Sequence, residues 1–242
     1  MLLEGILSRS PAHSVDDVVA IMNAIDEHLP DGDGLKWFNR LYLRVTVNVR
    51  NAVEGAIFND SAFLTRLDVV FANLYFSALA DAEIDLSKAP AAWRPLLRAR
   101  NIPGIARIQF ALAGMNAHIN RDLPEGIVQS FRMLGGDPIT GRVRHNDFES
   151  VNAILERVEE DVKRDFAVGL VGAIDQLGGP ADDAVAMWKV RAARAAAWTN
   201  AKVLWTLRDL PPLRDEFFAR LDGLIGLTSR GLLVPGGTAS RS

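Results

Sequence analysis

The chain has 242 residues, of which 49% are hydrophobic and 24% charged, a balance typical of a globular protein with a sizeable core. The net charge of -3 argues against a nucleic-acid partner, because such proteins usually carry a basic excess. No cysteine is present, which excludes disulfides, thiolate metal sites and cysteine nucleophiles.

The N-terminal stretch MLLEGILSRS has an acidic residue at position 4 and only a short apolar run, which does not fit a secretion signal. No run approaches the ~18 uncharged apolar residues, with membrane flanks, of a spanning helix. We therefore expect a cytoplasmic location and no membrane insertion.

Apolar residues recur at helical spacing in the first part of the chain. Residues 14–29 are predicted to form a helix with Ser14 near its N-cap. The segment 35–58 also fits a strand-like alternation, but it runs for about 24 residues without a turn, whereas strands usually span about 3–10. Helix is therefore favoured. A third helix, apolar on most faces, is predicted from Asp60 or Ser61 to about Ala82.

The middle of the chain contains its most apolar stretch. A short helix is predicted within 88–101, interrupted at Pro95, and is followed by the stretch 104–121. Between Arg107 and Arg121 this stretch has no Lys, Arg, Asp or Glu, which predicts a helix buried nearly all round.

Asp122 and Glu125 then resemble a capping box, which predicts a new helix up to Leu134. A polar loop at 137–146 follows. The remaining predicted elements are an amphipathic helix at 147–177, an Ala-rich helix at 182–207 and a last helix at 213–227.

These elements predict an all-α fold, a bundle of roughly eight helices with short connections. We expect a single domain over residues 1–230, organised around the buried helix at 104–121. The Gly/Ser-rich residues 231–242 are expected to form a flexible tail.

Three ionisable residues in the two most apolar helices are the candidate catalytic residues. His118 and Asp122 lie four residues apart, so a continuous helix places them on one face. Such a pair can act as a base with its orienting carboxylate or can ligate a divalent metal ion. Asp68 lies mid-helix, where a buried carboxylate must pair, bind a metal ion or stay protonated. A metal ion held by His118, Asp122 and Asp68 is therefore one alternative.

Each of these residues also has a structural interpretation. Asp122 can be only a helix cap, and His118 can be only a hydrogen-bonded imidazole of the core. Asp68 can form an ion pair, for which the candidate partners are Arg191, Arg194 and His118.

A second group of polar and aromatic side chains can contact a substrate. The amides of Gln109, Asn116 and Asn120 can read a polar ligand, or can bond to neighbouring helices and fix their register. Arg194 can contribute to an anion site, and His145 lies at a loop-to-helix junction. The candidate substrate-binding residues are Asn116, Asn120, Arg121, Asn73, Tyr75, Arg194, Trp198 and His145.

Several common motifs are missing from the sequence. It contains no Gly-rich phosphate loop, no G-x-S-x-G and no H-E-x-x-H. We therefore expect no nucleotide or flavin cofactor, and a small molecule rather than a nucleic acid as the partner. Assembly into a homo-oligomer is left open.

Five blocks of the sequence together resemble one family. They are DGLKWFNRLYLRVT (33–46), LDVVFANLYFSAL (67–79), FALAGMNAHINRDLP (110–124), HNDFESVN (145–152) and ARAAAW (193–198). They are similar to an uncharacterised, largely actinobacterial all-helical domain of unknown function, over most of residues 15–207. The resemblance implies an all-α domain and favours a role for His118, Asn120, Arg121 and Asp122. It implies no reaction, cofactor or partner, and Phe148 stands where the family pattern would offer a tyrosine hydroxyl.

Two functions fit these observations. The first is an enzyme that acts on a small, largely apolar metabolite inside the bundle by acid–base chemistry, with or without a metal ion. Hydrolysis, cyclisation or isomerisation would suit it, because desolvation perturbs the pKa values of buried groups. The alternative is a non-catalytic ligand-binding or oligomeric protein whose buried polar groups are structural. A ligand-sized cavity beside His118 favours the enzyme, and a close-packed interior favours the alternative.

Overall fold

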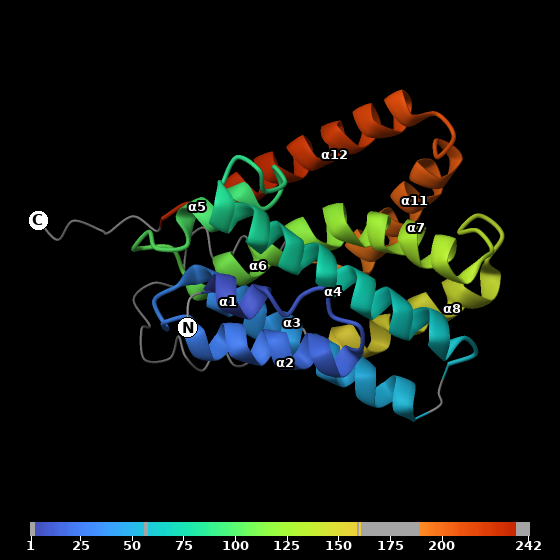
Figure 1. Ribbon diagram of the computed structural model, residues 1–242, viewed down its shortest axis with the longest axis horizontal. Helices are drawn as coiled ribbons and strands as arrows, with labels where there is room; N and C mark the ends of the chain where they lie inside the picture. Colours follow the sequence, from blue (N-terminus) through green and yellow to red (C-terminus); the bar gives the residue numbers. More distant parts are fainter. Residues whose placement is uncertain (1–2, 56–57, 159, 161–188, 236–242) are drawn as a thin grey trace, which may run out of the picture.

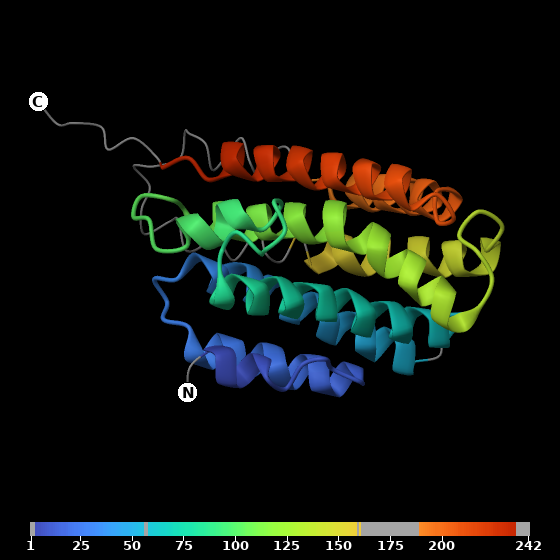
Figure 2. The same cartoon turned by 45° about the horizontal axis from the view of Figure 1, so that its top comes forward.

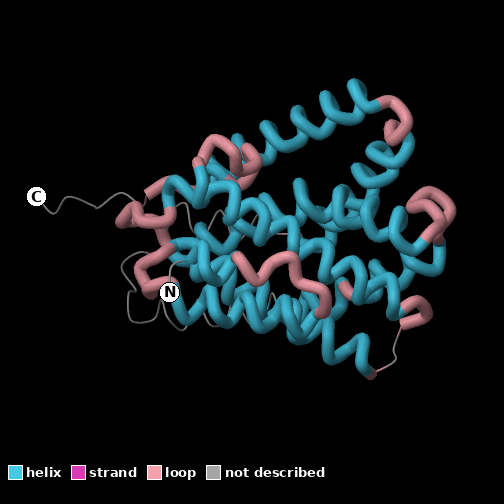
Figure 3. Tube along the Cα trace, viewed as in Figure 1, coloured by secondary structure: helices cyan, strands magenta, loops and turns pink. Residues whose placement is uncertain are grey.

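The computed structural model describes residues 3–55, 58–158, 160 and 189–235, and every regular element in this part of the chain is a helix (Figure 3). The all-α prediction is confirmed, including the choice of helix for the ambiguous segment 35–58. The elements in chain order are α1 (Leu3–Leu7), α2 (Val15–His28), α3 (Gly34–Glu54), α4 (Ser61–Ile84), α5 (Arg94–Ala99), α6 (Arg107–Ala117), the π-helix η1 (His118–Asp122), α7 (Leu123–Leu134), α8 (Arg142–Ser150), α11 (Val190–Thr206) and α12 (Pro211–Leu232).

The helices stack in successive layers (Figures 1 and 2). Helices α1 and α2 lie on one side, α3 and α4 come next, and the run from α6 through α7 lies beyond them. Helices α11 and α12 pack on the far side of that run. Buried apolar side chains from all these layers form one continuous core, as a packed helical bundle requires.

Side-chain caps define where three of the helices begin. The Ser14 hydroxyl accepts a hydrogen bond from the backbone N–H of Asp17, whose carboxylate accepts one from the backbone N–H of Ser14. This capping box starts α2 as predicted. Asp33 caps α3 and Asp60 caps α4, each by accepting a backbone N–H of its own first turn at 2.9 Å.

The central run differs from the predicted helix that ends at residue 121. Helix α6 passes into η1 and then α7 without a break, and Asp122 has helical backbone angles and no capping hydrogen bond. The predicted cap at Asp122 is therefore wrong. The wider π-turn lets the N–H of Leu123 bond to the carbonyl of His118. Pro124, which has no N–H to donate, is thereby tolerated at the start of α7.

Two other predicted boundaries are also wrong. Pro95 does not interrupt its helix but lies in the first turn of α5, where proline is tolerated. Helix α8 begins at Arg142, inside the predicted loop 137–146. Most of the predicted helix 147–177, and residues 182–188 of the next one, lie outside the described residues.

The end of the chain is held in place beyond residue 230, the predicted domain boundary. Helix α12 continues to Leu232, and Gln109 donates hydrogen bonds of 2.9 Å to the carbonyl oxygens of Leu232 and Val234. Residues 236–242 of the predicted tail lie outside the described part.

Helix α4 is buried along much of its length. By length and composition alone it is the one described helix that could cross a membrane, with a mean hydropathy of 1.3. In the structure 56% of that apolar window is buried against other helices, an arrangement that a core helix also shows.

Close packing of α3 against α6 depends on Gly114. A Cβ at this position would lie 2.3 Å from Cγ of Phe38, whose ring is fully buried. We expect Gly114→Ala to lower the free energy of unfolding by about 1–3 kcal/mol, because the ring must move in a filled core. Gly223 in α12 has nothing within 4 Å of such a Cβ. Gly223→Ala should therefore raise the free energy of unfolding by up to about 1 kcal/mol. Urea denaturation measures both, and equal shifts would contradict this packing.

Candidate functional site

His118 and Asp122 meet at the centre of the bundle. Nδ1 of His118 lies 2.9 Å from Oδ2 of Asp122, and both side chains are buried. Asp122 also accepts hydrogen bonds from Nε1 of Trp93 at 2.9 Å and from Nη1 of Arg121 at 2.7 Å. Because the carboxylate only accepts, Nδ1 of His118 is the donor, which leaves a lone pair on Nε2 of the neutral ring.

Aromatic side chains surround the His118 ring. Phe71 stacks on it with ring centroids 3.5 Å apart, and Tyr42 meets it edge-on at 4.4 Å. Three further rings lie 5.8–6.1 Å away, those of Phe38, Trp93 and Tyr75. Burial lowers the pKa of His118 although its bond to Asp122 opposes this shift, so the imidazole is neutral at pH 7. Its buried Nε2 has no hydrogen-bond partner among the described residues.

This close packing favours the structural interpretation of His118. A base must approach the proton that it removes to within hydrogen-bonding distance, directly or through one water molecule. Around His118 the neighbouring space is taken by rings, most closely by Phe71. A substrate could reach Nε2 only if a ring moved.

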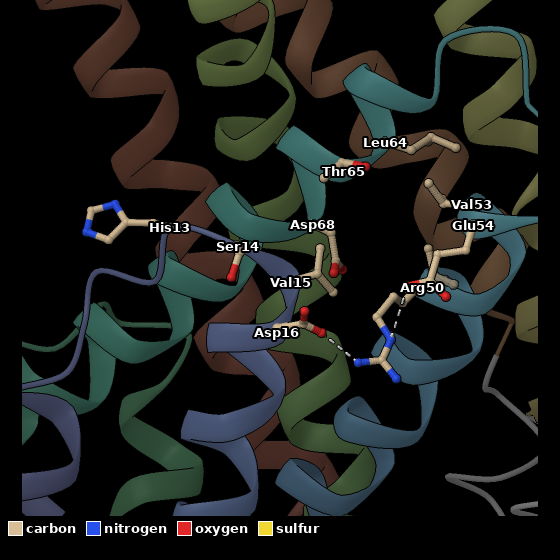
Figure 4. A pocket seen from close by; sticks show the side chains of 11 residues that line it. His13, Ser14, Val15, Asp16, Arg50, Val53, Glu54, Leu64, Thr65 and Asp68 are labelled. Carbon is tan, nitrogen blue, oxygen red and sulfur yellow. Dashed lines mark hydrogen bonds and ion pairs between the residues drawn. The ribbon is translucent and has the colours of Figure 1, made fainter. Parts of the chain in front are cut away.

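Asp68 lies in a different environment, at a pocket near the surface. A pocket of about 310 Å³, which we call the Asp68 pocket, opens to solvent here. It is lined by the start of α2, the end of α3 and part of α4. Figure 4 shows the Asp68 carboxyl group pointing from α4 into this space. Its apolar walls include Val15, Val49, Val53 and Leu64.

The Asp68 carboxyl group has no partner for one of its oxygens. The residue is partly buried, and its buried Oδ2 accepts no hydrogen bond from the described residues. Burial raises the pKa of Asp68 to about 7, because desolvation disfavours the charged form. The carboxyl group of this lining residue is therefore half ionised near neutral pH.

The one Lys or Arg side chain among the described residues that line the pocket, that of Arg50, is already paired. Nη1 of Arg50 lies 2.8 Å from Oδ1 of Asp16, and its Nε lies 3.9 Å from Oε1 of Glu54 (Figure 4). The predicted ion pair of Asp68 with Arg191 or Arg194 is wrong, because both lie on α11, which is not among the elements that enclose the pocket.

Tyr42 links the pocket to the centre of the bundle. Burial is the main cause that raises its pKa, and the negative charges of Asp68 and Asp122 raise it further. The hydroxyl of Thr46, one turn along α3, offsets part of this rise, although neither hydroxyl makes a hydrogen bond of normal geometry. Phe71, one turn from Asp68 on α4, contacts both Tyr42 and His118. The Asp68 pocket and the His118–Asp122 pair are thus neighbours, but Oδ2 of Asp68 makes no hydrogen bond to either residue of that pair.

The proposed metal ligands do not come together. Among the described residues no three His, Asp or Glu side chains are grouped in a way that could hold a metal ion. Both oxygens of Asp122 are occupied by nitrogen donors, and the unpaired Oδ2 of Asp68 is not bonded to His118. The set of His118, Asp122 and Asp68 therefore does not fit one metal site in this structure.

The side-chain amides of Asn116 on α6 and Asn120 on η1 hold neighbouring helices together. Asn116 donates hydrogen bonds to the carbonyl of Ile225 and the hydroxyl of Ser229 on α12. Asn120 in turn donates to Oδ1 of Asn116 at 2.9 Å. Of the two predicted uses of these amides, the fixing of helix register agrees with these bonds. Asn116 and Asn120 also line a second surface pocket, of about 350 Å³.

Three other predicted substrate-binding residues are bonded within the bundle. Asn73 exchanges two hydrogen bonds with the backbone of Ala12, at 2.7 and 2.9 Å. The hydroxyl of Tyr75 donates to Oδ1 of Asn39 at 3.3 Å. Arg121 bonds to Asp122 and covers the ring of Phe218 at 4.8 Å.

The remaining candidates gather near α8 and are not among the residues that line the Asp68 pocket. Arg194 is buried and donates to Oδ1 of Asn152 and to the carbonyl of Phe148. Trp198 donates to the carbonyl of Pro138 at 3.2 Å. The ring of His145 lies 4.6 Å from that of Trp198. Arg191 forms a surface ion pair of 2.7 Å with Glu156. The structure thus places the predicted site residues in several separate groups.

Two residues that contact the candidate site residues were not identified from the sequence. Trp93, the second donor to Oδ2 of Asp122, gave no signal, because the two residues are 29 positions apart. Tyr42 did give a signal, since it lies four residues after Phe38 and four before Thr46 on the helical face that is buried.

The chain was also compared with known proteins. Neither curated proteins nor solved structures give a match. A family model does match, and it confirms the resemblance seen in the sequence. The chain belongs to the family of unknown function DUF5995, whose model covers residues 15–235.

Proposed function

We propose that this protein binds a small molecule with a largely apolar body in the Asp68 pocket. One observation carries the proposal: Asp68 lines an open, apolar-walled pocket, and one of its carboxyl oxygens is buried and accepts no hydrogen bond from the described residues. Leaving a buried polar atom unpaired is costly, so an unpaired carboxyl oxygen calls for an explanation such as a bound partner. The volume of about 310 Å³ is at the small end of the range for ligand pockets.

A second candidate, an acid–base enzyme, is favoured by the pKa of about 7 for Asp68. A carboxyl group with this pKa can give or accept a proton at neutral pH, which is the property of a general acid or base. Hydrolysis, or cyclisation or isomerisation driven by proton transfer, would suit such a group. In this candidate Asp68 exchanges the proton, and His118 contributes only if the ring of Phe71 moves aside.

A metabolite screen tests both candidates. The full chain is dialysed against a cell extract, and mass spectrometry measures which small molecules are retained and which are consumed. Asp68→Asn is the test variant, and Glu27→Gln is the charge-matched control, because Glu27 is exposed and outside the pocket. Thr65→Trp fills the pocket while keeping Asp68.

Binding predicts one or more molecules that the wild type and Glu27→Gln retain and that both pocket variants lose. Catalysis predicts in addition a molecule whose rate of consumption falls by about 10²-fold in Asp68→Asn. Circular dichroism confirms that each variant is folded. Retention and consumption that are the same in folded pocket variants as in the wild type would contradict both candidates.

A further inference from the structure

The charges around Asp68 indicate what kind of ligand fits the pocket, an inference that rests on the proposed binding there. Three carboxyl groups line the pocket, those of Asp16, Glu54 and Asp68, against one guanidinium, that of Arg50. Arg50 pairs with Asp16 and approaches Glu54, and Oδ2 of Asp68 accepts no hydrogen bond from the part of the chain that the structure describes. When Asp68 ionises, the pocket therefore has an unmatched negative charge.

The hydrogen-bond donor that is missing beside Asp68 defines the ligand further. An acceptor oxygen without a partner requires an N–H or O–H donor, and a carboxylate binds a charged donor most strongly. The walls beside it, Val15, Val53 and Leu64, are apolar and suit a hydrocarbon group. A bare metal ion would gain nothing from these walls, and a quaternary ammonium would bring no N–H.

We propose that the ligand is an organic ammonium ion, a protonated primary or secondary amine. Its N–H groups bond to the Asp68 carboxylate, and its hydrocarbon part contacts the apolar walls. Arg50 stays paired with Asp16. Its positive charge repels a cationic ligand whose charged group does not contact Asp68.

Ammonium binding is expected to depend on pH. The ion pairs with the ionised carboxylate, so below pH 7 each binding event must release the proton of Asp68 and the affinity must fall. The other charged or titratable groups packed around Asp68 are His13 before α2, Asp16 on α2, Tyr42, Arg50 and Glu54 on α3, and the His118–Asp122 pair behind Phe71. His13→Asn removes the histidine that lines the pocket, and it separates the contribution of that side chain from that of Asp68.

Binding of a matched set of probes to the full chain tests this proposal. The probes are benzylammonium, its neutral counterpart benzyl alcohol, and benzyltrimethylammonium, which has no N–H donor. Amide chemical shifts locate each probe, and their titration gives the dissociation constant at pH 6 and pH 8.

We expect benzylammonium to shift the amides of Val53 and Thr65 at the pocket. It should bind at least about tenfold more tightly than either other probe, because only it supplies a charged donor. Its affinity should be higher at pH 8 than at pH 6, should persist in His13→Asn and Glu27→Gln, and should fall about tenfold or more in Asp68→Asn.

Three results would overturn the ammonium proposal, and they are distinguishable from failure of the proposed function. Equal binding of benzyl alcohol and benzylammonium, abolished in both cases by Thr65→Trp, would remove the ammonium proposal and leave small-molecule binding intact. Equal affinity of benzylammonium for the wild type and folded Asp68→Asn would do the same. A lack of pocket shifts with every probe would contradict the ammonium proposal, while retention in the metabolite screen would still support binding of another class of molecule.

Discussion

Replacing Asp122 with alanine is expected to lower the free energy of unfolding by about 3–5 kcal/mol. The buried carboxylate accepts hydrogen bonds from Trp93, Arg121 and His118, all within 2.9 Å. Its removal leaves the indole N–H and the imidazole N–H without an acceptor in a dry interior, and the guanidinium loses its buried counter-charge. Asparagine would restore one acceptor oxygen, but its NH₂ group would face a donor, so Asp122→Asn should also be destabilised.

Urea denaturation at pH 7 measures the effect of Asp122→Ala. Asp209→Ala is the control, because Asp209 is exposed and forms only a 3.4 Å ion pair with Arg208. Its free energy of unfolding should stay within about 0.5 kcal/mol of the wild type. A loss of less than about 1 kcal/mol in Asp122→Ala would show that the three donors do not depend on this carboxylate.

The second large effect is a gain in stability. Asp68→Asn is expected to raise the free energy of unfolding at pH 8.5 by about 2–3 kcal/mol, because it removes a buried charge without a partner. A rise in pKa from 3.8 to about 7 corresponds to about 4 kcal/mol, and partial exposure of Asp68 lowers this figure. Asparagine has the shape of the protonated acid, so the variant resembles the uncharged form at every pH.

The sign of the pH dependence follows from the raised pKa. Between pH 3.8 and about 7 the folded state holds a proton on Asp68 that the unfolded state has lost. The stability that the folded state has while Asp68 is protonated is therefore fully present below pH 3.8 and is lost as the pH rises through 7. The difference between Asp68→Asn and the wild type should be near zero at pH 4 and should grow up to pH 8.5.

Denaturation of the variant and the wild type across this pH range checks the prediction. The series is repeated in His13→Asn, because His13 is the histidine that lines the Asp68 pocket. Glu27→Gln serves as the exposed control and should differ from the wild type by the same small amount at each pH. An Asp68→Asn variant that is less stable than the wild type at pH 8.5 would mean that the carboxylate has a partner.

Much of the fold could be predicted from local patterns. Helical spacing of apolar residues predicted α2, α3 and α4, although not the short helix α1, and the capping residues Ser14 and Asp60 indicated where α2 and α4 begin. The segment 35–58 shows why length matters. Its strand-like alternation was outweighed by a run too long for a strand, and the segment is the helix α3.

The central run shows where such patterns fail. Asp122, Pro124 and Glu125 have the composition of a helix start, yet the chain continues through a π-turn. The donors that hold the Asp122 carboxylate include Trp93, which comes from a distant part of the sequence. Tertiary partners therefore overrode a local capping signal.

The candidate site was predicted only in part, for a related reason. The spacing of His118 and Asp122 predicted their contact, because residues four apart share one face of an α-helix, and the two side chains still meet across the π-turn η1. The separation of Asp68 from them depends on how α2, α3 and α4 pack, which no local pattern encodes. The amides of α6 had two interpretations in the sequence, and only the position of α12 decides between them.

The most direct test of this account is the pKa of the Asp68 carboxyl group in the ligand-free chain. Carboxyl ¹³C chemical shifts of labelled protein give it, and the signal that is missing from Asp68→Asn identifies the residue. The structure predicts a midpoint of about 7 for this signal. A midpoint below about 5 would mean that Asp68 is solvated or paired, and it would contradict the unpaired carboxyl group on which the proposed site depends.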